Sequence, residues 1–241
     1  MSQEHTVRSY DEELAHLSNL IARMGGLAEA QLEGAVQALL HRDSERAGSI
    51  IAGDAKVDDL EQEVHSFTVR LLALRQPVAQ DLRSIVAALK ISGDIERIAD
   101  YAANVAKRTL VLNQLPPVSP VAGVARLGRL VQEIVKNVLD AYADEDVEKA
   151  IRVWRQDEEV DDIYTSLFRE LLTYMMEDPR NITASIHLMF MAKNIERIGD
   201  HATNIAETIH FLVRGKPLGS ARPKGESSIL PEPLPEDDED A

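Results

Sequence analysis

One motif occurs twice in this sequence, and the repeat restricts the chain to folds built from two copies of one unit. Residues 95–106 read IERIADYAANVA and residues 195–206 read IERIGDHATNIA, with eight of the twelve positions identical. A second pair, GDAKVDDLEQEV at 53–64 and QDEEVDDIYTSL at 156–167, repeats at an offset of 103 instead of 100. Two offsets this similar indicate a tandem duplication, since loops can absorb the difference.

Apolar residues recur every three or four positions in the segments between prolines, which is the spacing of amphipathic helices. The motif itself carries such a stripe in Ile95, Ile98, Ala102 and Val105, and its copy begins at Ile195. Because prolines are typical helix boundaries, we expect antiparallel helices joined by short loops. The six expected helices span about 6–42, 44–75, 78–113, 120–143, 145–177 and 180–213.

The predicted fold is all-α: a tandem repeat of two antiparallel three-helix bundles, followed by a disordered acidic C-terminal tail. We expect the first bundle at 6–115, the second at 120–214 and the tail at 215–241. Half of the ten prolines lie in the tail beside many acidic residues, a composition typical of disorder. Asp43 or Ser44 is expected to cap the second helix, and Asp144 the fifth.

Charge and composition narrow the function classes. The net charge of −15 opposes binding to nucleic acid or anionic lipid and favours cations and basic partner proteins. The absence of cysteine excludes thiolate metal sites and leaves histidine and carboxylates as metal ligands. Because the N-terminus has no apolar signal region and no run approaches about 18 apolar residues, we expect a cytoplasmic protein.

The acidic residues of the motif form a column along the helix. With about 100° per residue and Ile95 at 0°, the apolar stripe centres near 320° and the column near 140°. The sequence therefore predicts that the column lies on the outer face, opposite the core. Spacing of four residues places neighbours about 6 Å apart. The columns comprise Glu96, Asp100 and Asn104 in the first copy and Glu196, Asp200 and Asn204 in the second.

The helices at 44–75 and 145–177 carry further oxygen ligands. Asp54, Asp58, Glu61 and His65 follow one flank of the first of these helices, and Asp157 and Asp161 begin the same flank of the second. Tyr164 and Phe168 replace the later ligands, so the first site is expected to be richer. Stacked carboxylates repel each other unless a cation lies between them, and Mg, Mn, Fe or Zn would accept such ligands. Arg97 and Arg197 are candidates for partner binding.

Other interpretations of the columns remain open. An acidic helix face is often simply solvated, and Arg97 and Arg197 would partly offset its charge. Repetition in both halves favours a shared role, because a merely solvated face is free to drift. The chain lacks a glycine-rich phosphate loop, a His-Glu-x-x-His motif and the Glu-x-x-His arrangement of ferritin-like proteins, so catalysis has little support. The alternatives are a metal-carboxylate hydrolase, a metal-storage protein or a helical spacer.

Four stretches resemble the PhoU family, the bacterial phosphate-uptake regulators. They are RQPVAQDLR at 75–83, IERIAD at 95–100, LLTYMMEDPR at 171–180 and IERIGDHATNI at 195–205. The resemblance extends over about 8–214. It implies a fold of two three-helix bundles and carries the family's metal motif onto Glu96 and Asp100 and onto Glu196 and Asp200.

The resemblance also implies a function. A PhoU-like protein is expected to be a negative regulator of the phosphate-starvation response and not an enzyme. It would connect the ATPase subunit of the phosphate ABC transporter with a sensor histidine kinase, and meet the inner membrane only through these partners. A homodimer is expected. Some family members hold multinuclear metal clusters on the Glu/Asp motif, which makes divalent or iron-type metal ions the expected cofactors.

Overall fold

The computed structural model describes residues 2–219, with side chains described from Tyr10 onward. Every regular element in this part of the chain is a helix, so the predicted all-α class is confirmed. The predicted tail lies outside the described residues apart from 215–219. The elements are α1 (Ser2–His41), α2 (Ser44–Gly53), α3 (Ala55–Arg75), α4 (Ala79–Leu112), α5 (Val121–Ala143), α6 (Val147–Arg155), α7 (Asp157–Glu177), the 3₁₀ helix η1 (Pro179–Asn181) and α8 (Ile182–Arg214).

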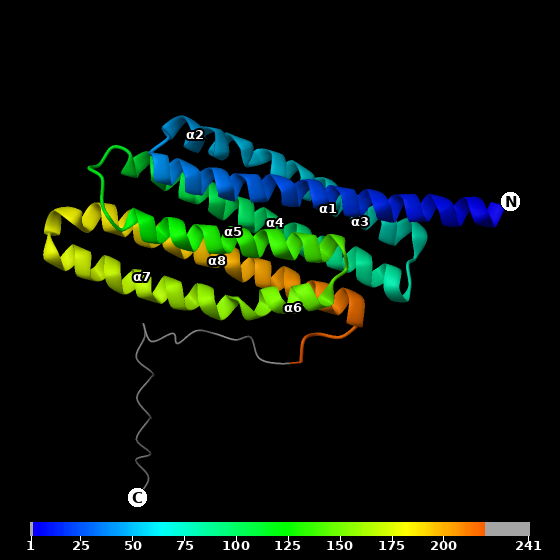
Figure 1. The fold of residues 1–241 in the computed structure, drawn as a ribbon. Coiled ribbons are helices and arrows are strands. Elements are labelled where there is room, and N and C mark those ends of the chain that lie inside the picture. Colours follow the sequence, from blue (N-terminus) through cyan, green and yellow to red (C-terminus); the bar gives the residue numbers. More distant parts are fainter. Residues whose placement is uncertain (1, 220–241) are drawn as a thin grey trace, which may run out of the picture.

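The helices form two three-helix bundles that pack side by side (Figure 1). In the first bundle α2 and α3 together pack on α1 and α4, and in the second α6 and α7 pack on α5 and α8. The bundles meet through α4 against α8 and α1 against α5. The α4–α8 contact is the most extensive in the described part of the chain, so both copies of the motif lie at the centre of the molecule.

Two of the six predicted helices are divided, which corrects the sequence-based boundaries. The helix expected at 44–75 breaks at Asp54, and the helix expected at 145–177 breaks at Gln156. At both breaks the backbone tightens to three-residue hydrogen bonds, from the Val57 N–H to the Asp54 carbonyl (2.9 Å) and from the Gln156 N–H to the Val153 carbonyl (3.0 Å). Such tightening bends a helix. The breaks fall at matching places in the two repeats.

The turns that precede α2 and α6 are built identically. Arg42 and Glu145 adopt positive φ angles of 53° and 50°. Asp43 then caps α2 by accepting from the Arg46 N–H, and Asp146 caps α6 by accepting from the Lys149 N–H, both at 2.9 Å. The prediction of Asp43 as a cap is confirmed.

The prediction that Asp144 caps the next helix is wrong. Asp144 ends α5, because the chain needs one left-handed residue before it can present a capping side chain. The left-handed residue is Glu145, and the capping residue is therefore Asp146.

The core is aliphatic, as the composition indicates. The predicted motif stripes are fully buried in both repeats, and their side chains are Ile95, Ile98, Ala102, Val105, Ile195, Ile198, Ala202 and Ile205. Trp154 is also largely buried, and its indole N–H donates to Glu207 at 3.0 Å. Among the helices described, none is both long enough and apolar enough to cross a bilayer.

The contact between α1 and α5 depends on glycine. A Cβ on Gly128 would lie 2.6 Å from Cγ2 of Val36, a β-branched side chain that is fully buried and has little rotamer freedom. We expect Gly128→Ala to lower the free energy of unfolding by about 1–3 kcal/mol, because the helices must separate. Urea denaturation would measure this change.

Gly48→Ala is the matched control, since no atom of the described residues lies within 4 Å of the added Cβ in α2. This control should be neutral or should stabilise by up to about 1 kcal/mol through its higher helix propensity. Equal effects of the two substitutions would contradict the close contact between α1 and α5.

Candidate functional site

Five carboxylates gather where α3 packs on α4. Glu96 and Asp100 come from α4, and Asp54, Asp58 and Glu61 come from the break before α3 and from α3 itself. Burial raises the pKa of Glu96, Arg97 opposes this effect, and the charges of Asp100, Asp58 and Glu61 raise the pKa further. These five residues, named here cluster I, therefore interact electrostatically.

Asp54 lies at the break between α2 and α3 and is half-buried. Burial raises its pKa, the neighbouring charges of Asp58 and Asp100 add to the rise, and Lys107 opposes it. Its Oδ1 atom is buried and has no hydrogen-bond partner among the described residues. Burying a carboxylate oxygen without a hydrogen-bond donor lowers the stability of the fold, so a positive charge placed beside cluster I would stabilise it.

Cluster II occupies the matching place between α7 and α8 and comprises Glu196, Asp200 and Asp161. Burial raises the pKa of Glu196, a hydrogen bond from Lys193 opposes this, and the charges of Asp200 and Asp161 raise it further. Nζ of Lys193 donates to Oε1 of Glu196 at 2.6 Å, whereas the buried Oε2 has no hydrogen-bond partner in the part of the chain that the structure describes. Lys193 therefore supplies a positive charge that cluster I lacks at the corresponding residue, Gly93.

The expectation of an outward-facing acidic column is wrong for the second repeat, and in the first repeat the column of Glu96, Asp100 and Asn104 is only half-exposed. Glu196 is only 9% exposed, because α7 covers the side of α8 that carries it. The helical wheel located one apolar stripe, but α8 contacts α4, α5, α6 and α7 and is therefore covered on several sides. Asp157 is also buried, and it accepts a hydrogen bond from the Thr203 hydroxyl at 3.2 Å.

The two asparagines of the motif have different neighbours. Oδ1 of Asn104 accepts from Lys107 at 3.2 Å. Nδ2 of Asn204 donates to Oδ1 of Asp94 on α4 at 3.4 Å, and this second asparagine therefore faces the α4–α8 contact.

Asp94 is a residue that the sequence reasoning did not single out. Its Oδ1 lies 2.8 Å from Nδ1 of His201, within hydrogen-bond distance, and this contact joins the two repeats. An approximate antiparallel register of α4 on α8 would have been needed to find this pair.

The arginines of the motif remain accessible. Nε of Arg97 lies 3.4 Å from Glu96, and its Nη1 lies 3.9 Å from Asp100, so this residue partly offsets the charge of cluster I. The guanidinium of Arg197 lies 5.6 Å from the centre of the Tyr101 ring and thus contacts the other repeat. His65 is exposed on α3.

The donor atoms of both clusters suit a hard cation. They are carboxylate oxygens, and each cluster contains one buried oxygen without a hydrogen-bond partner among the described residues. However, no three histidine, aspartate or glutamate side chains of the described residues are already arranged to hold a metal ion. Binding at either cluster would therefore require carboxylates to turn toward a common point.

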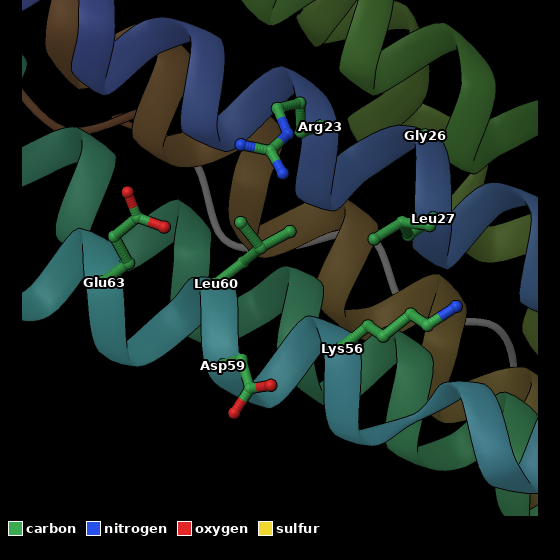
Figure 2. A pocket seen from close by; sticks show the side chains of 7 residues that line it. All are labelled: Arg23, Gly26, Leu27, Lys56, Asp59, Leu60 and Glu63. Carbon is green, nitrogen blue, oxygen red and sulfur yellow. The ribbon is translucent and has the colours of Figure 1, made fainter.

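A separate groove lies between α1 and α3 (Figure 2). It encloses about 620 Å³, and Leu27 of α1 and Leu60 of α3 contribute apolar surface. Both signs of charge line it, since Arg23 and Lys56 oppose Asp59 and Glu63. This mixture gives the groove no preference for an anion or a cation.

Comparisons with known proteins identify both repeats. The family model described as "PhoU domain" matches residues 21–109 and 124–209. The phosphate-specific transport system accessory protein PhoU homolog of Caulobacter vibrioides (strain NA1000 / CB15N) is 54% identical over 92% of this chain and 96% of its own length. The protein of the same name from Zymomonas mobilis is 50% identical over 89% of this chain and 90% of its own.

Solved structures agree with this similarity. The crystal structure of PhoU from Pseudomonas aeruginosa superposes with a TM-score of 0.84 at 40% identity, covering 86% of this chain and all of that one. The phosphate transport system regulatory protein PhoU from Streptococcus pneumoniae gives a TM-score of 0.81 at 27% identity over 88% of this chain and all of its own.

The buried charge of Asp54 predicts a pH-dependent stability. Because burial raises its pKa in the folded chain, ionised Asp54 destabilises the fold near neutral pH, and the penalty shrinks as the pH falls through the raised pKa. Asp54→Asn removes the charge without removing a helix cap, since this side chain makes no capping hydrogen bond. In chelator-treated protein the variant should unfold at a higher temperature than wild type near neutral pH, and this gain should shrink in acid.

Asp59→Asn is the matched control, because it removes the same charge from an exposed position on the same helix. Thermal unfolding followed by circular dichroism across a pH series would compare the variants. A gain for Asp54→Asn that is independent of pH, or a loss of stability near neutral pH, would refute the assigned cause.

Proposed function

This chain belongs to the PhoU family, and we propose that it is a negative regulator of phosphate uptake and of phosphate-starvation signalling. The observation that carries the proposal is the match of the PhoU domain to both halves of the chain. Relatives that cover nearly the whole chain bear the name phosphate-specific transport system accessory protein. PhoU is a family of regulatory accessory proteins and is not known as an enzyme family.

The proposed mode of action is that of an adaptor in the cytoplasm. When phosphate is plentiful, the protein would contact the ATPase subunit of the phosphate ABC transporter and a sensor histidine kinase, and would hold the kinase in its inhibitory state. A rigid core of two packed bundles suits this role, because it can present separate surfaces to two partners at a fixed distance. A homodimer would double these surfaces.

Metal binding at the two clusters is the second part of the proposal. Cluster I would hold a divalent or iron-type ion through Glu96, Asp100 and Asp58, with Asn104 nearby, and cluster II through Glu196, Asp200 and Asp161, with Asn204 nearby. The ion would supply the positive charge that offsets the repulsion and burial of these carboxylates. The carboxylates themselves would draw α3 toward α4 and α7 toward α8, and so alter the surface offered to partners.

A deletion strain tests the regulatory role. Removal of the gene should cause constitutive expression of phosphate-starvation genes in phosphate-rich medium, and the intact gene should restore repression. We expect the quadruple variant Glu96→Gln/Asp100→Asn/Glu196→Gln/Asp200→Asn to restore it only weakly, because its clusters lose their charge. A reporter fused to a starvation promoter gives the readout.

Asp59→Asn/Glu63→Gln is the control and should complement fully, because both residues of α3 line the α1–α3 groove and lie outside cluster I (Figure 2). Normal repression in the deletion strain would refute the regulatory role. Full complementation by the quadruple variant would show that regulation does not depend on these four carboxylates, and would favour the alternative of a helical spacer. Hydrolysis of phosphoesters in proportion to bound metal would favour the hydrolase.

A further inference from the structure

The first bundle is longer than the second at one end, because α1 extends past the end of α5. The two helices run antiparallel and close together, with Gly25 beside Leu139 and Gly128 beside Val36. α5 ends at Ala143, while α1 continues through Tyr10 to its start at Ser2. Figure 1 shows the N-terminal part of α1 projecting beyond the rest of the molecule. Along this part α1 does not pack against α5, as it does further along its length.

A cleft of about 610 Å³ lies at this place. Four helices contribute to its walls: α1, the first half of α4, the end of α5 and the end of α8. Much of its lining is apolar, with Leu14, Leu17, Leu139 and Leu212 among the contributors. In the four-helix arrangement of α1, α4, α5 and α8, the cleft runs beside the last turns of α5 and continues past the end of that helix.

The shape of the cleft suits a helix better than a compact small molecule. Its lining on α1 runs from Leu14 to Glu29, which at 1.5 Å per residue corresponds to about 22 Å, or about four helical turns. An apolar groove alongside helices is the usual acceptor of an amphipathic helix.

The charged residues that line the cleft favour an occupant with positive charge. Of the described residues that line it, three are acidic, namely Glu29, Asp140 and Glu145, and none is basic. Asp140 already pairs with Lys149 at 2.9 Å, whereas no salt bridge found among the described residues involves Glu29 or Glu145. The α1–α3 groove of Figure 2 differs in this respect, because it contains both signs of charge.

We propose that this cleft is a docking groove for an amphipathic, basic helix of a partner protein. The apolar face of that helix would cover the leucines of the groove, and its lysines or arginines would face Glu29 and Glu145. The inference goes beyond the regulatory role and rests on the cleft alone, so it stands even if repression proceeds through another surface. The net charge of −15 would speed the encounter with a basic segment.

A designed peptide provides the probe. It has 18 residues, with leucine on one helical face and lysine on the other, and its affinity for the full chain is measured by titration calorimetry. Ala22→Trp narrows the groove at an exposed position on α1, and Glu29→Lys/Glu145→Lys reverses its charge. Each change should weaken binding about tenfold or more, because it removes apolar contact or charge attraction.

Two controls distinguish the groove from general attraction to an acidic protein. Glu33→Lys/Glu133→Lys changes the net charge equally at exposed positions on α1 and α5 outside the groove, and should keep the affinity within about twofold. A peptide with glutamate in place of lysine should not bind. Circular dichroism of each variant confirms that the fold is kept.

Three results would overturn the proposal. The first is that the lysine peptide does not bind, or that Glu29→Lys/Glu145→Lys and Glu33→Lys/Glu133→Lys weaken its binding equally. The second is binding of a long-chain alkylammonium ion in the groove without binding of the peptide, which would identify a small-molecule site. The third is a dimer in analytical ultracentrifugation that Ala22→Trp dissociates, which would identify a second copy as the occupant.

Discussion

The antiparallel contact between α4 and α8 is the constraint on which the rest of the structure depends. Paired residues cross it at regular intervals: Asp94 with His201, Tyr101 with Arg197 and Phe190 with Arg108, whose guanidinium lies 4.2 Å from the ring centre. In each pair the two residue numbers add up to nearly the same value, as expected for two antiparallel helices that keep one register. Because both copies of the motif meet here, each motif helix is packed by its own bundle on one side and by the other repeat on another. The outer helices α3 and α7 then cover the acidic flanks.

This central position explains the unusual state of the carboxylates. On an isolated helix Glu96 and Glu196 would face water and carry an ordinary charge. Beneath α3 and α7 they lose part of their hydration while other carboxylates remain close, and the pKa of each rises. In the second repeat Lys193 compensates part of the charge. In cluster I the charges of Asp58 and Asp100 act on Asp54, whose buried Oδ1 has no hydrogen-bond partner among the described residues. The fold thus keeps destabilising charge at two matching places, and an added cation would relieve it.

Periodicity and duplication were enough to predict the helices, the two bundles and the buried stripes, because burial of an apolar face is a local property of a helix. The breaks at Asp54 and Gln156 could not be predicted this way, since the apolar period continues across them. The burial of Glu196 and the pairing of Asp94 with His201 depend on which helices lie next to each other. One helical wheel contains no information about those neighbours. The offset of 103 relates Asp43 to Asp146, so applying that offset to the helix caps would have predicted Asp146 correctly.

Thermal unfolding in the presence of manganese ions tests most directly whether the two clusters accept a cation. Metal that binds only the folded chain raises the unfolding temperature, and the stabilisation reaches about 2.7 kcal/mol at a hundredfold excess over Kd. Wild type and Asp59→Asn/Glu63→Gln should show this rise, and Glu96→Gln/Asp100→Asn/Glu196→Gln/Asp200→Asn should not. The same rise in the quadruple variant, or no rise in wild type, would contradict cation binding at the clusters.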